Sequence, residues 1–247
     1  MSISEPVRLA MWSGPRNIST AMMRAWENRS DTTVWDEPLY AYYLQESGSD
    51  HPGREEVIAA GEPRWQRVVE LATGRVPEGK RIHFQKHMTH HLLTSMDWDW
   101  LGALTNCFLI RDPREVIASY IKTRPNVTIE DVGIPQQAAI FEHVTRLTGK
   151  QPLVLDAKDV LRNPEVMLRA LCDALGVEFD AAMLSWPAGL RGSDGIWARY
   201  WYDSVRDSTG FVSYESKAHL LPAEFETLAR HCAPHYEALW ALRLKTV

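Results

Sequence analysis

Apolar residues occur along this chain in short runs that are separated by longer segments of helical spacing. Short runs predict strands at 7–12, 32–35, 106–110 and 152–155, and a segment in which apolar and polar residues alternate predicts another at 80–86. Between them, apolar residues recur at helical intervals, and strands that alternate with helices are typical of parallel βαβ units. The pattern therefore predicts an α/β fold of three layers, with a mostly parallel central sheet flanked by helices.

The ends of two expected helices are clearly marked. One begins at Asp112, an N-cap that is followed by Pro113 at the first helical position and by Glu115 three residues after the cap. Another runs over 163–175 and is closed by Gly176. The remaining expectations are a helix from the first turn to about residue 28, further helices over 55–72, 136–147 and 222–242, and a loop or lid over 45–53.

Length and charge limit the kind of protein. The chain has 247 residues and a formal net charge of −5. This length suits one large domain, and we expect a single domain over 1–247. The acidic balance argues against a general nucleic-acid binder, so any anion site must be a local basic cluster.

Cysteine usage and hydropathy indicate the compartment. The three cysteines, Cys107, Cys172 and Cys232, are far apart and lie in apolar patterns without a CxxC pair. This usage indicates reduced, buried thiols. No apolar run approaches the roughly 18 residues of a membrane span, and the N-terminus shows no secretory signal pattern. A cytoplasmic protein without membrane association is therefore expected.

The turn after the first strand carries residues that suit an anion. Gly14 and Pro15 favour a sharp turn. Arg16 can donate a fork of hydrogen bonds to phosphate or sulfate oxygens, and Ser19 and Thr20 add hydroxyl donors at the start of a helix. The alternative is an ordinary strand-to-helix turn with a capping serine.

A second strand-to-helix junction has similar chemistry. Arg111 follows the apolar run 106–110, and Ser119 lies eight residues further along. Ligands of open α/β sheets bind at the carboxyl ends of the strands, which is where Arg111 is expected. The alternative is an ion pair of Arg111 with Asp112 or Asp36, with Ser119 as a small packing residue. Two such junctions on one sheet could hold a ligand with anionic groups at both ends.

At these two junctions the chain resembles the sulfotransferase superfamily, whose donor is 3′-phosphoadenosine 5′-phosphosulfate (PAPS). In that family a modified P-loop follows the first strand, and the run Arg16-Asn17-Ile18-Ser19-Thr20 is similar to it, with Ile18 where the family usually has a glycine. The family's second motif has an Arg at a strand end and a Ser eight residues later, as Arg111 and Ser119 do here.

A segment near the C-terminus adds a third similarity. Residues 190–197 resemble the family motif Arg-Lys-Gly-x-x-Gly-x-Trp, with Leu190 in place of the leading Arg. The resemblance implies a P-loop NTPase-like sulfotransferase fold that uses PAPS as co-substrate and requires no metal. The donor-binding residues it implies are Gly14, Arg16, Asn17, Ile18, Ser19, Thr20, Arg111, Ser119, Arg191 and Gly192.

The implied reaction is transfer of a sulfonate group from PAPS to a hydroxyl or amine of a small-molecule acceptor, by in-line attack. The family often has a strand that ends in Lys-x-His, whose His is the base; here Lys86 matches, but Met88 occupies the His position. Lys86 and Arg16 would stabilise negative charge on the leaving oxygen. The base is left open among His90, His87, Asp36 and Glu37, with His91 as a weaker candidate.

Two further alternatives concern the histidines and the activity. His87, His90 and His91 have the spacing of metal ligands on a helix, but no fourth-ligand motif such as HExxH or CxxC accompanies them, so no metal site is predicted. A P-loop small-molecule kinase is disfavoured because the chain has no Gly-Lys-Ser/Thr run. A non-catalytic nucleotide-binding scaffold stays open because fold does not fix function.

Aromatic residues supply candidate walls for the acceptor site. They suit apolar or sugar-like ligands, but equally the core or a homo-oligomer contact, and this choice is left open. The residues are Tyr40, Tyr42, Tyr43, Trp197, Tyr200, Trp201 and Tyr202.

Overall fold

The computed structural model describes residues 5–77, 79–216, 218 and 221–246, so the ends of the expected domain at 1–4 and 247 lie outside the described residues. Five strands form one sheet in the order β2-β3-β1-β4-β5, and every neighbouring pair is parallel. The strands are β1 (Val7–Ser13), β2 (Thr32–Asp36), β3 (Ile82–Met88), β4 (Thr105–Ile110) and β5 (Leu153–Asp156). The predicted α/β fold is confirmed, and the parallel pairing follows from the helical segment between each strand and the next.

The carboxyl ends of the neighbouring strands meet at one edge of the sheet. Ser13, the last residue of β1, is paired with Met88 of β3 on one side and with Leu109 of β4 on the other. Asp36, the last residue of β2, is paired with Lys86 of β3. Parallel α/β sheets bind ligands outside this edge. The segments that follow these strands are therefore placed to build one site.

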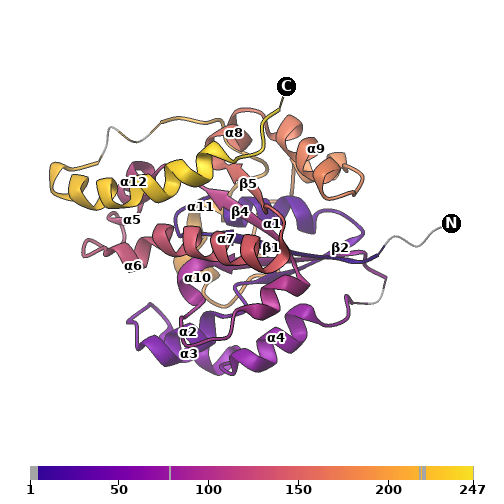
Figure 1. Cartoon of the computed structure of the whole chain (residues 1–247), viewed down its shortest axis with the longest axis horizontal. Helices are drawn as coiled ribbons and strands as arrows, with labels where there is room; N and C mark the ends of the chain where they lie inside the picture. Colours follow the sequence, from indigo (N-terminus) through magenta and orange to yellow (C-terminus); the bar gives the residue numbers. More distant parts are fainter. Residues whose placement is uncertain (1–4, 78, 217, 219–220, 247) are drawn as a thin grey trace.

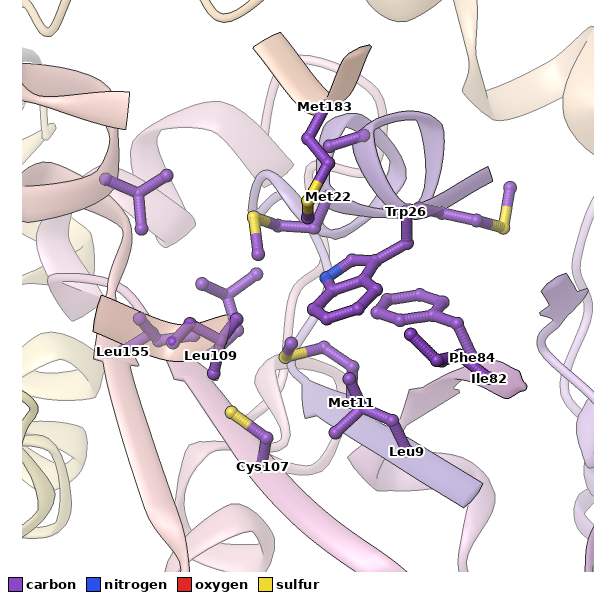
Figure 2. Packing of buried hydrophobic residues seen from close by; sticks show 14 of the residues in the cluster. Leu9, Met11, Met22, Trp26, Ile82, Phe84, Cys107, Leu109, Leu155 and Met183 are labelled. Atoms are coloured by element: carbon purple, nitrogen blue, oxygen red, sulfur yellow. The ribbon is translucent and has the colours of Figure 1, made fainter. Parts of the chain in front are cut away.

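One face of the sheet is covered by α1 (Ser19–Glu27), α8 (Ala157–Arg162) and α9 (Pro164–Ala174). Leu9 and Met11 of β1 belong to the buried cluster on this face, together with Trp26 and Phe84. Figure 2 shows the Trp26 indole against the Phe84 ring, with 5.8 Å between their centroids. This packing fixes α1, and hence the turn before it, against the sheet.

The opposite face is covered by α7 (Ile134–Thr148) and α12 (Glu226–Ala241). Trp12 and Phe108 belong to the cluster on this face, whereas Met11 and Cys107 belong to the other. Adjacent residues of one strand thus enter opposite clusters, as the two-residue repeat of a strand requires. The continuous apolar runs of β1 and β4 reflect burial on both faces.

The remaining helices complete the layers around the sheet; Tyr42 of α2 and Val68 of α4, for example, belong to the same buried cluster as Trp12. In Figure 1, α2, α3 and α4 lie together at the bottom of the view and α8 and α9 at the top, with the sheet between them. None of the described helices is long and apolar enough to cross a membrane. These remaining helices are α2 (Tyr40–Ser47), α3 (Arg54–Ala60), α4 (Trp65–Thr73), α5 (Pro113–Tyr120), α6 (Ile129–Val132), α10 (Ala198–Trp201) and α11 (Asp203–Arg206).

Several sequence-based boundaries are corrected by the structure. The helix expected over 55–72 is two helices, α3 and α4, because a segment with Gly61 and Pro63 interrupts it. Part of the loop expected over 45–53 is helical, since α2 continues to Ser47 and ends at Gly48, whose φ is 67°. By contrast, the predicted cap of α5 is confirmed: the Asp112 carboxylate accepts a hydrogen bond from the backbone N–H of Arg114.

Candidate functional site

A cavity of about 630 Å³ opens at the carboxyl edge of the sheet. Its walls come from the β1–α1 turn, the ends of β2 and β3, residues within 111–122 on and beside α5, and C-terminal residues within 201–215. The structure brings together most of the predicted site residues here. Those that line the cavity are Arg16, Asn17, Ile18, Ser19, Thr20, Glu37, Lys86, His90, His91, Arg111 and Ser119.

Side-chain and backbone contacts fix the shape of the β1–α1 turn. The Asn17 side chain donates to the Leu109 carbonyl at 2.9 Å and accepts from the Ile18 N–H at 2.8 Å, so it shapes the turn. Ile18 provides no side-chain cap for α1, and the first turn of this helix has no acidic residue. The positive end of the helix, with Ser19 and Thr20, therefore faces the cavity without a counter-charge of its own.

The two predicted anion-binding junctions touch each other directly. Arg16 Nε donates to the Ser119 hydroxyl at 3.1 Å, and Arg111 Nη1 donates to the Arg16 carbonyl at 2.9 Å. The ion-pair partner of Arg111 is Glu115, with 3.1 Å between Nε and Oε2, rather than Asp112 or Asp36. Burial, and then the charge of Arg111, lower the pKa of Arg16. An anion would relieve this crowding of cations.

Lys86 of β3 also lines the cavity, in contact with two carboxylates and a phenol. Its ammonium donates to Asp36 Oδ1 at 3.0 Å, to Glu37 Oε1 at 2.5 Å and to the Tyr202 hydroxyl at 3.0 Å. Burial opposes the charge of Lys86, but Asp36 and then Glu37 outweigh it, so its pKa lies well above the ordinary value. Burial raises the pKa of Glu37 to about 6, although Lys86 opposes the shift.

The histidines near the end of β3 divide between two environments. His90 and His91 line the cavity, whereas His87 is buried against Trp12, with 4.3 Å between the ring centroids. His87 is part of β3, so it lies on the opposite face from Lys86 and does not share a helix with the other two. Within the described residues, no group of three or more His, Cys, Asp or Glu side chains is arranged to hold a metal ion.

Burial dominates the chemistry of the cavity histidines. It lowers the pKa of His90 to about 3, and it lowers that of His91 well below the ordinary value. The Nδ1 atom of His90 is buried and has no hydrogen-bond partner among the described residues. Both side chains are therefore neutral near pH 7 and present aromatic, polar walls rather than cations.

The predicted third motif lies outside the cavity lining. Arg191 is paired with Glu27 of α1 at 2.5 Å, and the neighbouring Asp194 holds the fully buried Arg24 with contacts of 2.5 and 2.7 Å. Gly192 does not line the cavity either. This segment binds to α1 through ion pairs, and these contacts occupy the cation that the motif would offer a ligand.

Gly14 and Asp36 support the site without lining it. A Cβ atom on Gly14 would lie only 2.7 Å from the carbonyl oxygen of Val132, so the turn needs glycine to pack against α6. Asp36 uses both carboxylate oxygens: Lys86 donates to Oδ1, the Gly195 N–H donates to Oδ2, and the Tyr202 hydroxyl contacts both.

Some lining residues had no signal in the sequence. His51, in the expected loop, bonds through Nδ1 to the Tyr40 hydroxyl at 2.8 Å. Tyr214, from a segment without periodicity, donates to Glu115 Oε1 at 2.7 Å across the cavity wall. Of the aromatic candidates, Tyr40, Trp201 and Tyr202 line the cavity, whereas Tyr42, Tyr43, Trp197 and Tyr200 do not.

The chain is similar to one protein family and to two curated plant proteins. The family model described as "Sulfotransferase domain" matches residues 7–243. The chain is 35% identical over 240 residues to branched-chain-amino-acid aminotransferase-like protein 1 of Arabidopsis thaliana, covering 96% of this chain and 42% of that protein. It is 34% identical over 229 residues to branched-chain-amino-acid aminotransferase-like protein 2 of Arabidopsis thaliana, covering 92% of this chain and 40% of that protein. The chain thus spans about two fifths of the length of these curated relatives.

A solved structure shows the same fold. A sulfotransferase from Alicyclobacillus acidocaldarius superposes with a TM-score of 0.54 at 14% sequence identity. The superposition covers 99% of this chain and 98% of that one. At this identity the likeness concerns the fold alone.

Proposed function

Since the chain belongs to the sulfotransferase domain family, we propose that it transfers a sulfonate group from PAPS to a hydroxyl or amine of a small molecule. The observation that carries this proposal is the direct contact between the two anion-binding junctions. Arg16 bonds Ser119, Arg111 bonds the Arg16 carbonyl, and all three line one cavity with Lys86. A donor with phosphate groups at both ends of a nucleoside fits two linked cationic ends.

The donor site follows from the charges and donors of the two junctions. Arg16, Ser19 and Thr20, with the amides at the start of α1, would hold the 5′-phosphate and the sulfonate. Arg111 and Ser119 would hold the 3′-phosphate. Arg191 is left out of this assignment because Glu27 already pairs with it.

Glu37 is the base in this proposal. Its carboxylate lines the cavity, and its pKa of about 6 lies near the operating pH, which favours proton transfer in both directions. Asp36 lies behind the cavity wall with both oxygens occupied, and the lowered pKa of His90, about 3, makes its imidazole a weak base.

The reaction balances with these residues. The acceptor oxygen or nitrogen attacks sulfur in line, its proton passes to the Glu37 carboxylate, and the bond between sulfur and the bridging phosphate oxygen breaks. Lys86 and Arg16 stabilise the negative charge on the leaving oxygen. The acceptor would lie against Tyr40, Trp201 and the neutral histidines, which suit a small organic molecule.

The names of the Arabidopsis thaliana relatives do not enter the proposal. Those proteins are called aminotransferase-like as wholes, and this chain covers about two fifths of each. The similarity to these relatives extends over nearly all of this chain, and the sulfotransferase domain model matches residues 7–243 of it.

The test is calorimetric binding of 3′,5′-adenosine bisphosphate, the spent donor, with ADP and ATP as controls. Micromolar binding of the bisphosphate, with little binding of ADP, would support the donor site. Equal binding of all three nucleotides, or of none, would overturn it. Release of the bisphosphate from PAPS in the presence of an acceptor panel would then separate an enzyme from a nucleotide-binding scaffold.

A further inference from the structure

Every N–H donor of Lys86 is already engaged. An ammonium group has three donors. In this structure the three acceptors are Asp36 Oδ1 at 3.0 Å, Glu37 Oε1 at 2.5 Å and the Tyr202 hydroxyl oxygen at 3.0 Å. Lys86 is only 1% exposed, so water does not offer it other partners. If Lys86 is to stabilise a leaving oxygen, one of these three contacts must be given up.

Two of the three partners are fixed. The Tyr202 hydroxyl lies 2.7 and 2.8 Å from the two Asp36 oxygens, so its proton points at Asp36 and its lone pairs face Lys86. Asp36 is held again by the Gly195 N–H at 3.1 Å. Asp36, Tyr202 and Gly195 thus form a rigid anchor that ties β2 to the C-terminal segment.

Glu37 is the partner that a ligand can reach. It follows the end of β2 with a φ of 42°, a left-handed backbone that turns its side chain toward the cavity wall. The side chain is 11% exposed, compared with 1% for Asp36. Its second oxygen, Oε2, lies 4.0 Å from His91 Nδ1. This distance is too long for a hydrogen bond, so Oε2 can accept a proton from an acceptor in the cavity.

We propose that Glu37 couples deprotonation of the acceptor to stabilisation of the leaving group, and that Tyr202 is the positioning residue that keeps Lys86 in place during the exchange. The proposal rests on the proposed sulfonate transfer. When Glu37 takes the acceptor proton, its bond to Lys86 changes from one between two opposite charges to a weaker one between the ammonium and a neutral carboxylic acid. One N–H of Lys86 then turns to the bridging phosphate oxygen while the bond between this oxygen and sulfur breaks. Lys86 keeps all three protons throughout.

This coupling also explains the role of the aromatic C-terminal segment. Residues 195–202 do not meet the donor junctions directly, but they supply both the Gly195 N–H and the Tyr202 hydroxyl to Asp36. The segment therefore acts on the chemistry through the position of Lys86.

The test uses the whole chain with PAPS, and water as the acceptor, in single-turnover release of 3′,5′-adenosine bisphosphate. Glu37→Gln is expected to slow release about 100-fold, as loss of a general base does. Tyr202→Phe is expected to slow it about tenfold, because Lys86 loses one of its three acceptors and Asp36 loses the hydroxyl donor. The matched control is Tyr200→Phe, since Tyr200 does not line the main cavity; its rate should equal that of the wild type.

The double variant tests the coupling itself. In Glu37→Gln the partner of Lys86 is neutral throughout, so the position of Lys86 no longer changes with proton transfer, and adding Tyr202→Phe should cost less than twofold there. A full tenfold cost in both backgrounds would overturn the coupling, and wild-type rates for Tyr202→Phe would overturn the positioning role. Bisphosphate affinity should stay within twofold of wild type in each variant, which also reports folding.

Two outcomes keep this inference separate from the proposed function. If the wild type neither binds the bisphosphate nor turns over PAPS, the proposed function fails, and the coupling fails with it. If the wild type turns over PAPS and the variants behave independently, only the coupling fails. Should Tyr202→Phe not fold, Asp36→Asn tests the same anchor, with slowed release expected and an unchanged rate overturning it.

Discussion

The guanidinium of Arg16 donates a hydrogen bond to the hydroxyl of Ser119 over 3.1 Å, although 103 residues separate them along the chain. This contact exists because β1 and β4 are parallel neighbours, so the turns that follow them lie side by side. Arg111 adds a second link by donating to the Arg16 carbonyl. The donor-binding halves of the proposed site therefore form one hydrogen-bonded unit before any ligand enters.

Replacing Arg111 by Ala is expected to weaken binding of 3′,5′-adenosine bisphosphate by about 1.5–3 kcal/mol, as for other hydrogen bonds to charged groups. ADP, which lacks the 3′-phosphate, should lose no affinity. Titration calorimetry measures both. The control is Arg114→Ala, because Arg114 pairs with Glu226 and does not line the cavity. Equal losses in the two variants would contradict the assignment of Arg111.

The sequence foretold these junctions because their signals are local. Asp112 and Pro113 mark the start of α5, so the preceding Arg111 had to lie at a strand end, and the structure places it there. The apolar runs of β1 and β4 predicted strands for the same reason, since burial on both faces leaves a continuous pattern.

The parts that the sequence could not give depend on contacts between distant segments. The spacing of His87 and His90 suggested a shared helix, but pairing with β1 extends β3 through His87 and turns it toward Trp12. Arg191 matched a donor-binding motif, yet it forms an ion pair with Glu27 of α1. Tyr202 and Asp36 are 166 residues apart in the sequence, so the residues around neither of them indicate their contact.

Activity is expected to rise with pH through about 6 and then level off. Glu37, whose pKa is raised to about 6, is inactive as a base when protonated and active above that value. The measurement is single-turnover release of 3′,5′-adenosine bisphosphate from PAPS between pH 5 and 8. Glu37→Gln should abolish this dependence, and His90→Gln should keep it. A pH profile that disappears with His90 instead would assign the base to that histidine.

The folded protein is expected to lose stability as the pH falls below 6.5. Burial lowers the pKa of His87 and His90 to about 3, so between pH 6.5 and 3 the unfolded chain binds protons that the folded chain does not. Each histidine whose protonation is suppressed contributes about 2 kcal/mol of this loss by pH 5. Burial raises the pKa of the Glu37 and Asp156 carboxyls, and these two groups act in the opposite sense.

Urea unfolding at pH 7.5 and at pH 5.0 measures this loss. His87→Phe keeps a ring against Trp12 but cannot titrate, so its stability should fall less between the two pH values than that of the wild type. Equal stability of the wild type at both pH values would show that these histidines take up protons without unfolding the chain.

Arg24→Met is expected to destabilise the fold by about 3–5 kcal/mol, because it leaves the Asp194 carboxylate buried without its counter-charge, although the Arg191 N–H still donates to it at 2.8 Å. The side chains of Arg24 and Asp194 are 0% and 3% exposed, and two contacts of 2.5 and 2.7 Å join them. Urea unfolding at pH 7.5 gives the change. Replacing both residues, Arg24→Met with Asp194→Leu, should recover most of the loss, since no uncompensated charge remains.

Because Asp194 precedes Gly195, whose N–H donates to Asp36, the single variant Arg24→Met should also slow release of the bisphosphate from PAPS. If the single variant were as stable as the wild type, the segment 190–197 would be held on α1 by other contacts, and its link to Lys86 would lose this support.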